Sequence, residues 1–420
     1  MADMPALVDR REFLRRVGLA VAGLPVAGSL LAACSADAPR TVPSSAAPIG
    51  AGGLGPTFES GRPIEQGAVL RVYEWKDYLA RDVLRSFERR FRHQGVTVKV
   101  DSFSHVDEAV AVLADPATEY DIFFPTVDVL DGLIAARLLR PLDHAQLPNL
   151  GNLWPWFRAA DGPFYDPGAR YTVPYTVYSS GIGWRHDRVA AADAPDALAN
   201  PFDVFWNTRY RGKVGMYDDY VEALSLALQR LGVTDLRDAT EAELAAAASD
   251  LETAVREVGV EFTADGAWDG LPGGEFSIHQ AWSGDILTAR RYAVEEGYPE
   301  RVDQLRYWSP PTGKVVGCDL MAVCARGRQP ELAHAFIDHL LQVDVGMTNF
   351  SWNGYQPPLT ALTREAFDDP SFAWRDAVPP NLRATILSED DFATGQMLVG
   401  FGPSEQARWL AQWNRVVGDA

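Results

Sequence analysis

From residue 68 onward, short apolar runs alternate with longer amphipathic stretches. Residues 68–73 and 96–100 predict strands, and residues 78–92 place apolar side chains along one face of a helix. Residues 106–113 predict a second helix and residues 120–124 a third strand. Strand–helix–strand alternation of this kind predicts an α/β fold, with a mostly parallel sheet covered by helices on both faces.

The alternation continues in a second unit that begins around residues 171–184. This unit contains a predicted strand at 213–216 and a predicted helix at 221–231. A long helix then starts at Thr240, which forms a capping box with Glu243. The chain of 420 residues is long enough to build two domains around separate cores.

A buried apolar run at 315–325 predicts the strand that returns the chain to the first unit, and a helix at 330–341 follows it. Cys318 and Cys324 lie in this strand. At about 3.3 Å per residue they are roughly 20 Å apart, which is beyond disulfide reach. We therefore interpret both as small buried apolar residues.

The N-terminus has the pattern of an export signal. Arg10 and Arg11 form a twin-arginine pattern, and residues 17–31 form an apolar run that is too short for a comfortable bilayer span of about 20 residues. The run ends in Leu-Ala-Ala-Cys, which resembles a bacterial lipobox with Cys34 as the lipidated residue. We predict a signal peptide over 1–33, with a single-pass anchor as the alternative, and a flexible tether over 34–66, which is rich in Ser, Ala, Pro and Gly.

The charge balance limits the partners. Lys and Arg total 38 against 57 Asp and Glu, giving a formal net charge of −19. Such an acidic surplus argues against nucleic acid and against anionic lipid headgroups, because both require a basic face. It is compatible with a cationic ligand, although solubility alone also explains it.

The sequence lacks the common motifs of catalysis. Its seven histidines include no metal-binding spacing, and it contains neither a G-x-S-x-G elbow nor a P-loop. We therefore expect no enzymatic activity, no cofactor and no metal. A secreted hydrolase with a triad assembled only in the fold is the alternative.

Aromatic and acidic residues instead follow the predicted strands, where α/β sheets bind ligands. Residues 74–78 follow the first strand, residues 218–222 follow a strand of the second unit, and residues 282–285 follow an apolar run. Asp319 lies within the returning strand. Carboxylates bind ammonium groups by charge-assisted hydrogen bonds, and aromatic faces pack alkyl chains and attract cations.

With these segments the chain resembles the spermidine/putrescine-binding proteins of bacterial polyamine ABC transporters. The resemblance covers most of residues 68–416 and rests on short segments in the same order: 72–78 (VYEWKDY), 120–126 (YDIFFPT), 173–175 (VPY), 210–213 (YRGK), 218–219 (DD) and 354–357 (GYQP). It implies a type II periplasmic-binding-protein fold, in which two α/β lobes joined by crossing hinge strands close on a ligand. The expected partners are a polyamine, an ABC permease with its ATPase and, through Cys34, the membrane; the protein is expected to be a monomer.

The resemblance also implies roles for individual residues. Trp75, Tyr78 and Tyr355 would line the cleft, with Thr126 just after the third strand. Trp282 would stack on the methylene chain. The polar contacts would come from a carboxylate pair, two further amine-binding carboxylates and an amide: Asp219 with Glu222, then Asp285, Asp319 and Gln396.

Local chemistry assigns the neighbouring charges differently. Asp77 is predicted to cap the following helix, and Asp218 and Lys76 are predicted to face solvent. Two positions depart from the resembled family, which usually has an aromatic residue at each. Gly317 predicts a more open side of the pocket, and Asp128 either adds a carboxylate or faces solvent.

The resemblance further predicts lobe boundaries. The N-lobe would comprise 67–173 and 318–356, and the C-lobe 174–317 and 357–416. Hinge passages are expected near 174–176, 314–317 and 356–358. Putrescine and spermidine both remain open. The motif from Trp282 to Asp285 resembles the putrescine-preferring branch of that family, whereas the pair of Asp219 and Glu222 resembles the spermidine-preferring branch. Other organic cations, amino-acid derivatives, ferric chelates and a sensor role are the remaining alternatives.

Overall fold

A computed structural model describes residues 63–104, 106–159 and 163–418. The chain divides into two units, 1–58 and 59–420, and the described residues all belong to the second. The predicted signal peptide 1–33, Cys34 and most of the predicted tether lie outside the described residues. Within the described part of the chain, no helix has both the length and the apolar character needed to cross a membrane.

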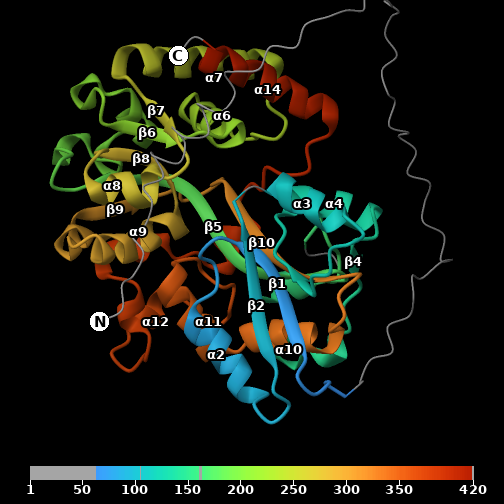
Figure 1. The fold of residues 1–420 in the computed structure, drawn as a ribbon. Coiled ribbons are helices and arrows are strands. Elements are labelled where there is room, and N and C mark those ends of the chain that lie inside the picture. Colours follow the sequence, from blue (N-terminus) through green and yellow to red (C-terminus); the bar gives the residue numbers. More distant parts are fainter. Residues whose placement is uncertain (1–62, 105, 160–162, 419–420) are drawn as a thin grey trace, which may run out of the picture. The chain divides into compact units, whose positions relative to one another are not determined.

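The first half of the sheet has the strand order β2-β1-β3-β10 (Figure 1). The first three strands pair in parallel, while β10 runs antiparallel to β3 and β4. The bounds are β1 (Val69–Trp75), β2 (Thr97–Phe103), β3 (Ile122–Phe123), β4 (Leu139–Arg140) and β10 (Val316–Cys324).

Helices cover both faces of this half, as the alternation predicted. Alternate strand residues enter two cores: Val72 and Ile122 face one, and Tyr73 and Phe123 the other. The first core is closed by α2 (Arg81–Arg90), α10 (Pro330–Leu340) and α11 (Val343–Asn353). The second is closed by α3 (Val106–Ala114) and α4 (Val127–Ala135).

The second half continues the sheet in the order β5-β8-β6-β7, with β9 also paired to β5. The bounds are β5 (Thr172–Arg185), β6 (Val214–Tyr217), β7 (Glu261–Thr263), β8 (Ile278–Trp282) and β9 (Leu305–Trp308). A further core lies under α6 (Tyr220–Arg230), α7 (Glu241–Val258) and α14 (Pro403–Gly418). The helix α9 (Ser283–Glu295) contributes to the first core instead. The shorter helices are α5 (Pro155–Arg158), α8 (Leu271–Gly273), α12 (Arg364–Asp368) and α13 (Glu389–Ala393).

The long strand β5 joins the two halves. Up to Ser179 it pairs with β10, and from Ser180 it pairs with β8 (Figure 1). A third segment lies beside it, because the backbone N–H of Val177 donates to the carbonyl of Gln356 over 2.8 Å. The three passages expected to act as hinges are therefore adjacent. The change of partner falls after Ser179, several residues beyond the lobe boundary placed at 173.

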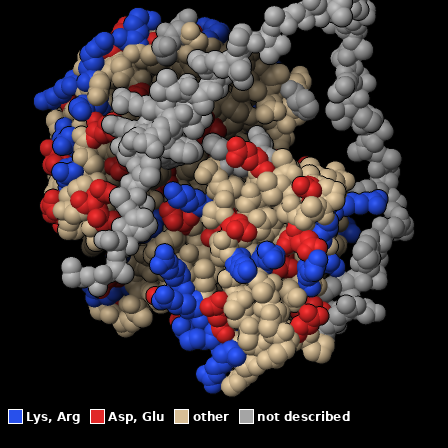
Figure 2. Space-filling model, viewed as in Figure 1, with Lys and Arg blue, Asp and Glu red and all other residues tan. Residues whose placement is uncertain are grey.

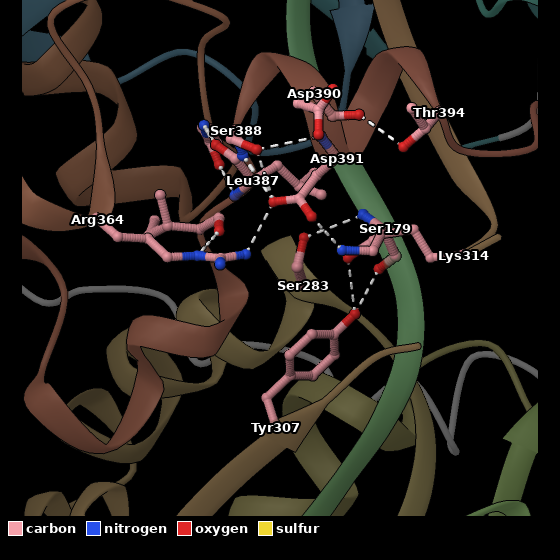
Figure 3. A network of polar contacts seen from close by, with 12 residues as sticks. Ser179, Ser283, Tyr307, Lys314, Arg364, Leu387, Ser388, Asp390, Asp391 and Thr394 are labelled. Atoms are coloured by element: carbon pink, nitrogen blue, oxygen red, sulfur yellow. Dashed lines mark hydrogen bonds and ion pairs between the residues drawn. The ribbon is translucent and has the colours of Figure 1, made fainter. Parts of the chain in front are cut away.

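A polar network fixes the segment just before β10, at Lys314 (Figure 3). The ammonium of Lys314 lies 2.6 Å from a carboxylate oxygen of Asp391, and the guanidinium of Arg364 lies 2.9 Å from the other oxygen. Asp391 also accepts from Ser388 in the capping box of α13. Lys314 is buried, so this carboxylate neutralises a cation inside the protein.

Most predicted elements are confirmed, with corrections at their ends. The capping box of Thr240 and Glu243 is present at the start of α7. Cys318 and Cys324 are buried free thiols, as interpreted. The prediction that Asp77 caps a helix is wrong: α2 begins at Arg81 behind Ala80, and Asp77 has a left-handed backbone with φ of 59° in the preceding turn. The unit 59–420 contains all the cores described above and therefore has what a domain needs to fold by itself.

Candidate functional site

Three carboxylates come from different elements and are buried. Glu222 and Asp285 lie in the first turns of α6 and α9, and Asp319 lies in β10. Their exposed fractions are 8%, 4% and 7%. Buried carboxylates are uncommon unless they are paired, so the partners of these three define the chemistry of the site.

Asp319 is held by neutral hydroxyl groups. It accepts hydrogen bonds from Tyr78 and, over 3.2 Å, from Thr176. The pairing of β10 with β5 slips by one residue at this point, because Asp319 pairs with Thr176 and the next residue with Pro174, which has no N–H. Thr126 forms a bridge with Asp319, and its buried hydroxyl makes no hydrogen bond with the described residues.

Asp285 is bound by two tyrosines. The hydroxyl of Tyr217 donates to one oxygen over 2.6 Å, and the hydroxyl of Tyr355 donates to the other over 2.5 Å. Gly284 explains how Tyr355 reaches this position, since a Cβ atom at 284 would lie 2.5 Å from the tyrosine ring. The small residue before Asp285 therefore makes room for one of its donors.

Glu222 has three side-chain donors. Ser180 and the indole N–H of Trp282 donate to one oxygen over 2.9 and 2.7 Å, and Gln280 donates to the other over 3.1 Å. The predicted partner carboxylate, Asp219, has a different local role: one of its oxygens caps α6 by accepting from the backbone of residues 221 and 222. Asp219 nevertheless lies near enough for its charge to act on Glu222.

All three carboxyl groups hold their protons more tightly than in water. Burial raises the pKa of Glu222 to about 7, and the nearby charges of Asp219 and Asp285 add to this effect. Burial likewise raises the pKa of Asp285 and of Asp319 to about 6, against the hydrogen bonds that favour their ionised forms. Within the described chain, no Lys, Arg or His forms an ion pair with any of them. The site thus has an excess of negative charge that only its protons relieve.

Aromatic rings connect the carboxylates. Trp282 stacks on Tyr217 with ring centroids 4.3 Å apart, and Tyr178 lies 5.4 Å from Trp282. Tyr355 is 6.2 Å from Tyr178 and 5.6 Å from Tyr78. The charges of Asp319 and Glu222 both act on Tyr178, which places this ring near both carboxylates.

The expectation of a more open side at Gly317 is wrong. A Cβ atom at Gly317 would lie 2.3 Å from the ring of Tyr178, so the tyrosine occupies the space that the missing side chain leaves. Four residues of the site, Tyr178, Tyr217, Ser180 and Gln280, were not predicted from the sequence. Tyr217 was detectable in principle, since it directly precedes the Asp218 and Asp219 pair at the end of a predicted strand.

The remaining predicted residues make no hydrogen bond to the three carboxylates among the described residues. Trp75 packs on Phe103 with ring centroids 4.6 Å apart. Gln396 uses both amide atoms elsewhere: its oxygen accepts from the backbone of Leu236 and its nitrogen donates to the backbone of Gly313. Lys76 and Asp218 are exposed, as predicted. Asp128 is exposed too, yet its charge acts on Asp319.

The fold is thus a mixed α/β sheet joined by one long strand, with buried acceptors and aromatic rings around the place where that strand changes partners. The chain belongs to the family of bacterial extracellular solute-binding proteins, whose model matches residues 83–375. It is accordingly a solute-binding protein rather than an enzyme.

Individual proteins with similar sequences or structures agree with this family assignment. The chain is 28% identical to the putrescine/cadaverine-binding protein of Pseudomonas aeruginosa over 65% of this chain and 74% of the relative. It is 25% identical to a spermidine/putrescine-binding periplasmic protein of Salmonella typhimurium over 84% and 88%. In structure it is similar to the spermidine/putrescine substrate-binding protein PotD of Streptococcus pneumoniae, with a TM-score of 0.67 at 19% identity over 83% and 98% of the two chains.

Proposed function

We propose that this protein captures a linear polyamine such as putrescine or spermidine and delivers it to an ABC importer. The observation that carries the proposal is the set of buried carboxylates, Glu222, Asp285 and Asp319, which have only neutral donors within the described chain. An ammonium group can supply the missing charge and donate three hydrogen bonds. The named relatives, which bind putrescine, cadaverine or spermidine, support this choice.

The rings favour an alkyl cation over a compact one. Trp282, Tyr178 and Tyr355 offer apolar faces between carboxylates that come from separate elements. Aromatic faces pack methylene groups and attract ammonium groups, so a chain with charged ends satisfies rings and carboxylates together. The spacing of the carboxylates would then select ligand length.

The charge of the site argues against anionic ligands. A ligand carboxylate requires a basic partner, and the described residues place no Lys or Arg in contact with the three acidic groups. Amino-acid derivatives and ferric chelates would add negative charge to a site that already has an excess. We therefore favour a ligand with two or more positive charges and none negative.

We further propose that the protein is exported through its twin-arginine signal and anchored to the membrane through Cys34. The pattern of residues 10–34 supports this, since two arginines, a short apolar run and a lipobox occur in that order. An anchored receptor remains close to the permease that it serves.

The test is a ligand screen on the unit 59–420 by thermal shift, followed by calorimetry. Putrescine, cadaverine, spermidine and γ-aminobutyrate should be compared. Ligand at 100 times its Kd stabilises a protein by about 2.7 kcal/mol, so the transition midpoint should rise by a few degrees with a polyamine.

Asp285→Asn and Asp319→Asn should abolish that rise, because each removes a negative charge while keeping the shape of the side chain. Asp218→Asn, which alters an exposed carboxylate beside α6, is the matched control and should bind like the parent protein. A rise with γ-aminobutyrate and none with any polyamine would overturn the proposal and leave the fold intact.

A further inference from the structure

A row of arginines runs along the outer face of α2. Arg81, Arg85 and Arg89 are spaced by four residues and therefore lie above one another on one side of the helix. Arg90, the last residue of the helix, and Arg92 just beyond it extend the row, and all five residues are exposed. Val83 and Phe87 on the opposite side are buried in the first core. Figure 2 shows the resulting basic stripe along α2.

Little acidic charge offsets this stripe. Asp82 lies 3.6 Å from Arg85 on the surface, where solvent screens such a pair and leaves it weak. Glu88 points away from the stripe, because its carboxylate accepts from the backbone N–H of Val98 in β2. The stripe of Arg81, Arg85, Arg89, Arg90 and Arg92 is therefore a strongly positive surface on a chain of net charge −19.

The stripe ends where the chain enters the folded unit. The amide of Gln66 donates to the carbonyl of His93 over 3.0 Å, and the N–H of Gly67 donates to the carbonyl of Gln94 over 2.7 Å. His93 and Gln94 directly follow the last arginine of the stripe. A lipid on Cys34 would therefore pull on the body at this end of α2.

We propose that the arginine stripe on α2 docks on an anionic lipid surface and thereby orients the anchored body on the membrane. Charge complementarity supports the docking, since an anionic bilayer attracts each Lys or Arg that lies near its surface. This step rests on the proposed anchoring through Cys34: an anchored chain would enter the body beside this surface at Gln66, which favours lipid over an acidic protein partner. The net charge of the chain argued against anionic headgroups. It does not exclude such binding at α2, because the basic residues are concentrated on this one helix.

Vesicle flotation with the unit 59–420 tests the docking without the contribution of a lipid anchor. Vesicles of phosphatidylcholine should be compared with vesicles that contain phosphatidylglycerol, in low salt. We expect the parent unit to bind only the anionic vesicles. The variant Arg85→Gln/Arg89→Gln/Arg92→Gln should bind the anionic vesicles at least about tenfold more weakly in low salt. Raising the salt to physiological strength or above shortens the Debye length to about 8 Å or less and should abolish this difference.

A second triple variant controls for net charge. Arg209→Gln/Arg256→Gln/Arg328→Gln removes three exposed arginines from surface ion pairs away from α2 and changes the net charge equally. It should bind like the parent, and both variants should keep their thermal midpoints. Equal loss in the two triple variants, or equal binding to both vesicles, would overturn the proposal. Membrane binding that requires the transporter and does not depend on the charge of the lipid would also overturn the proposal. None of these outcomes depends on which solute the site binds.

Discussion

Glu222, Asp285 and Asp319 have pKa values of about 7, 6 and 6 in a site with no basic partner among the described residues. Near and below these pKa values the free protein keeps the three carboxyl groups protonated, because ionising them inside the fold requires burying charge. A bound cation reverses this preference and should release protons on binding. We therefore expect the same residues to influence both the stability of the free protein and the pH range in which it captures ligand.

The pH dependence of stability follows with a definite sign. Between about pH 4.5, the unfolded pKa of Glu222, and its folded pKa of about 7, the folded state binds more protons than the unfolded state. The contribution of Glu222 to stability is thus complete at low pH and is lost as pH rises, by up to about 3 kcal/mol. Glu222→Gln should remove this slope, so the difference in unfolding free energy between parent and variant should shift in favour of the variant from pH 5 to pH 7.5.

Denaturant unfolding at several pH values measures this difference and cancels groups that titrate equally in both proteins. Asp218→Asn, an exposed neighbour, should leave the slope unchanged. A parent and a Glu222→Gln variant with parallel pH profiles would contradict a raised pKa at this position.

The donors to these carboxylates show where sequence reasoning ends. Tyr217 and Tyr355 are 68 and 70 residues from Asp285, and Tyr78 is 241 residues from Asp319. No local pattern links residues so far apart. Tyr78 and Tyr355 were selected only through the resemblance to a known family, and Tyr217 was not selected, because these contacts depend on how the two sheet halves meet.

At the scale of elements, periodicity located strands and helices but not the pairing at the crossing. The run at 315–325 corresponds closely to β10, since an apolar strand buried on both faces has a clear pattern. The run at 120–124 gives only the two paired residues of β3. The slip beside Asp319 and the exchange of partners after Ser179 were not predicted, because both depend on backbone pairing rather than side-chain character.

The network at the entry to β10 should be important for stability. Lys314 and Asp391 have exposed side-chain fractions of 4% and 15%, so their ion pair is largely removed from water. Asp391→Ala would leave the Lys314 ammonium buried without its counter-charge, and we expect a loss of about 3 kcal/mol or more. Asp390→Ala, which changes the exposed neighbouring carboxylate, should cost far less. Equal midpoints for the two variants in urea unfolding would show that the pair contributes nothing.

At the scale of the whole molecule, charge is distributed unevenly. The net charge of −19 coexists with a basic stripe on α2 and an uncompensated acidic site. The amino-acid composition predicted neither feature, because a net charge summed over the chain does not say where the charged residues lie. Local charge matters more for binding than the net charge does, since screened electrostatics act over about 8 Å at physiological salt.

Anchoring is also a property of the whole molecule, and its test is direct. If Cys34 receives a diacylglyceryl group, the protein should fractionate with membranes, because each buried methylene contributes about 0.8 kcal/mol. Cys34→Ser should remove the lipid and leave the exported protein soluble or uncleaved. Cys324→Ser, which alters a buried thiol, should leave lipidation and fractionation unchanged.

Labelling with a fatty acid distinguishes the two variants: label retained in Cys34→Ser would exclude this residue as the attachment site. In that case α2 would have to hold the body at the membrane by charge alone, and high salt would then release the protein, whereas an anchored protein would remain bound.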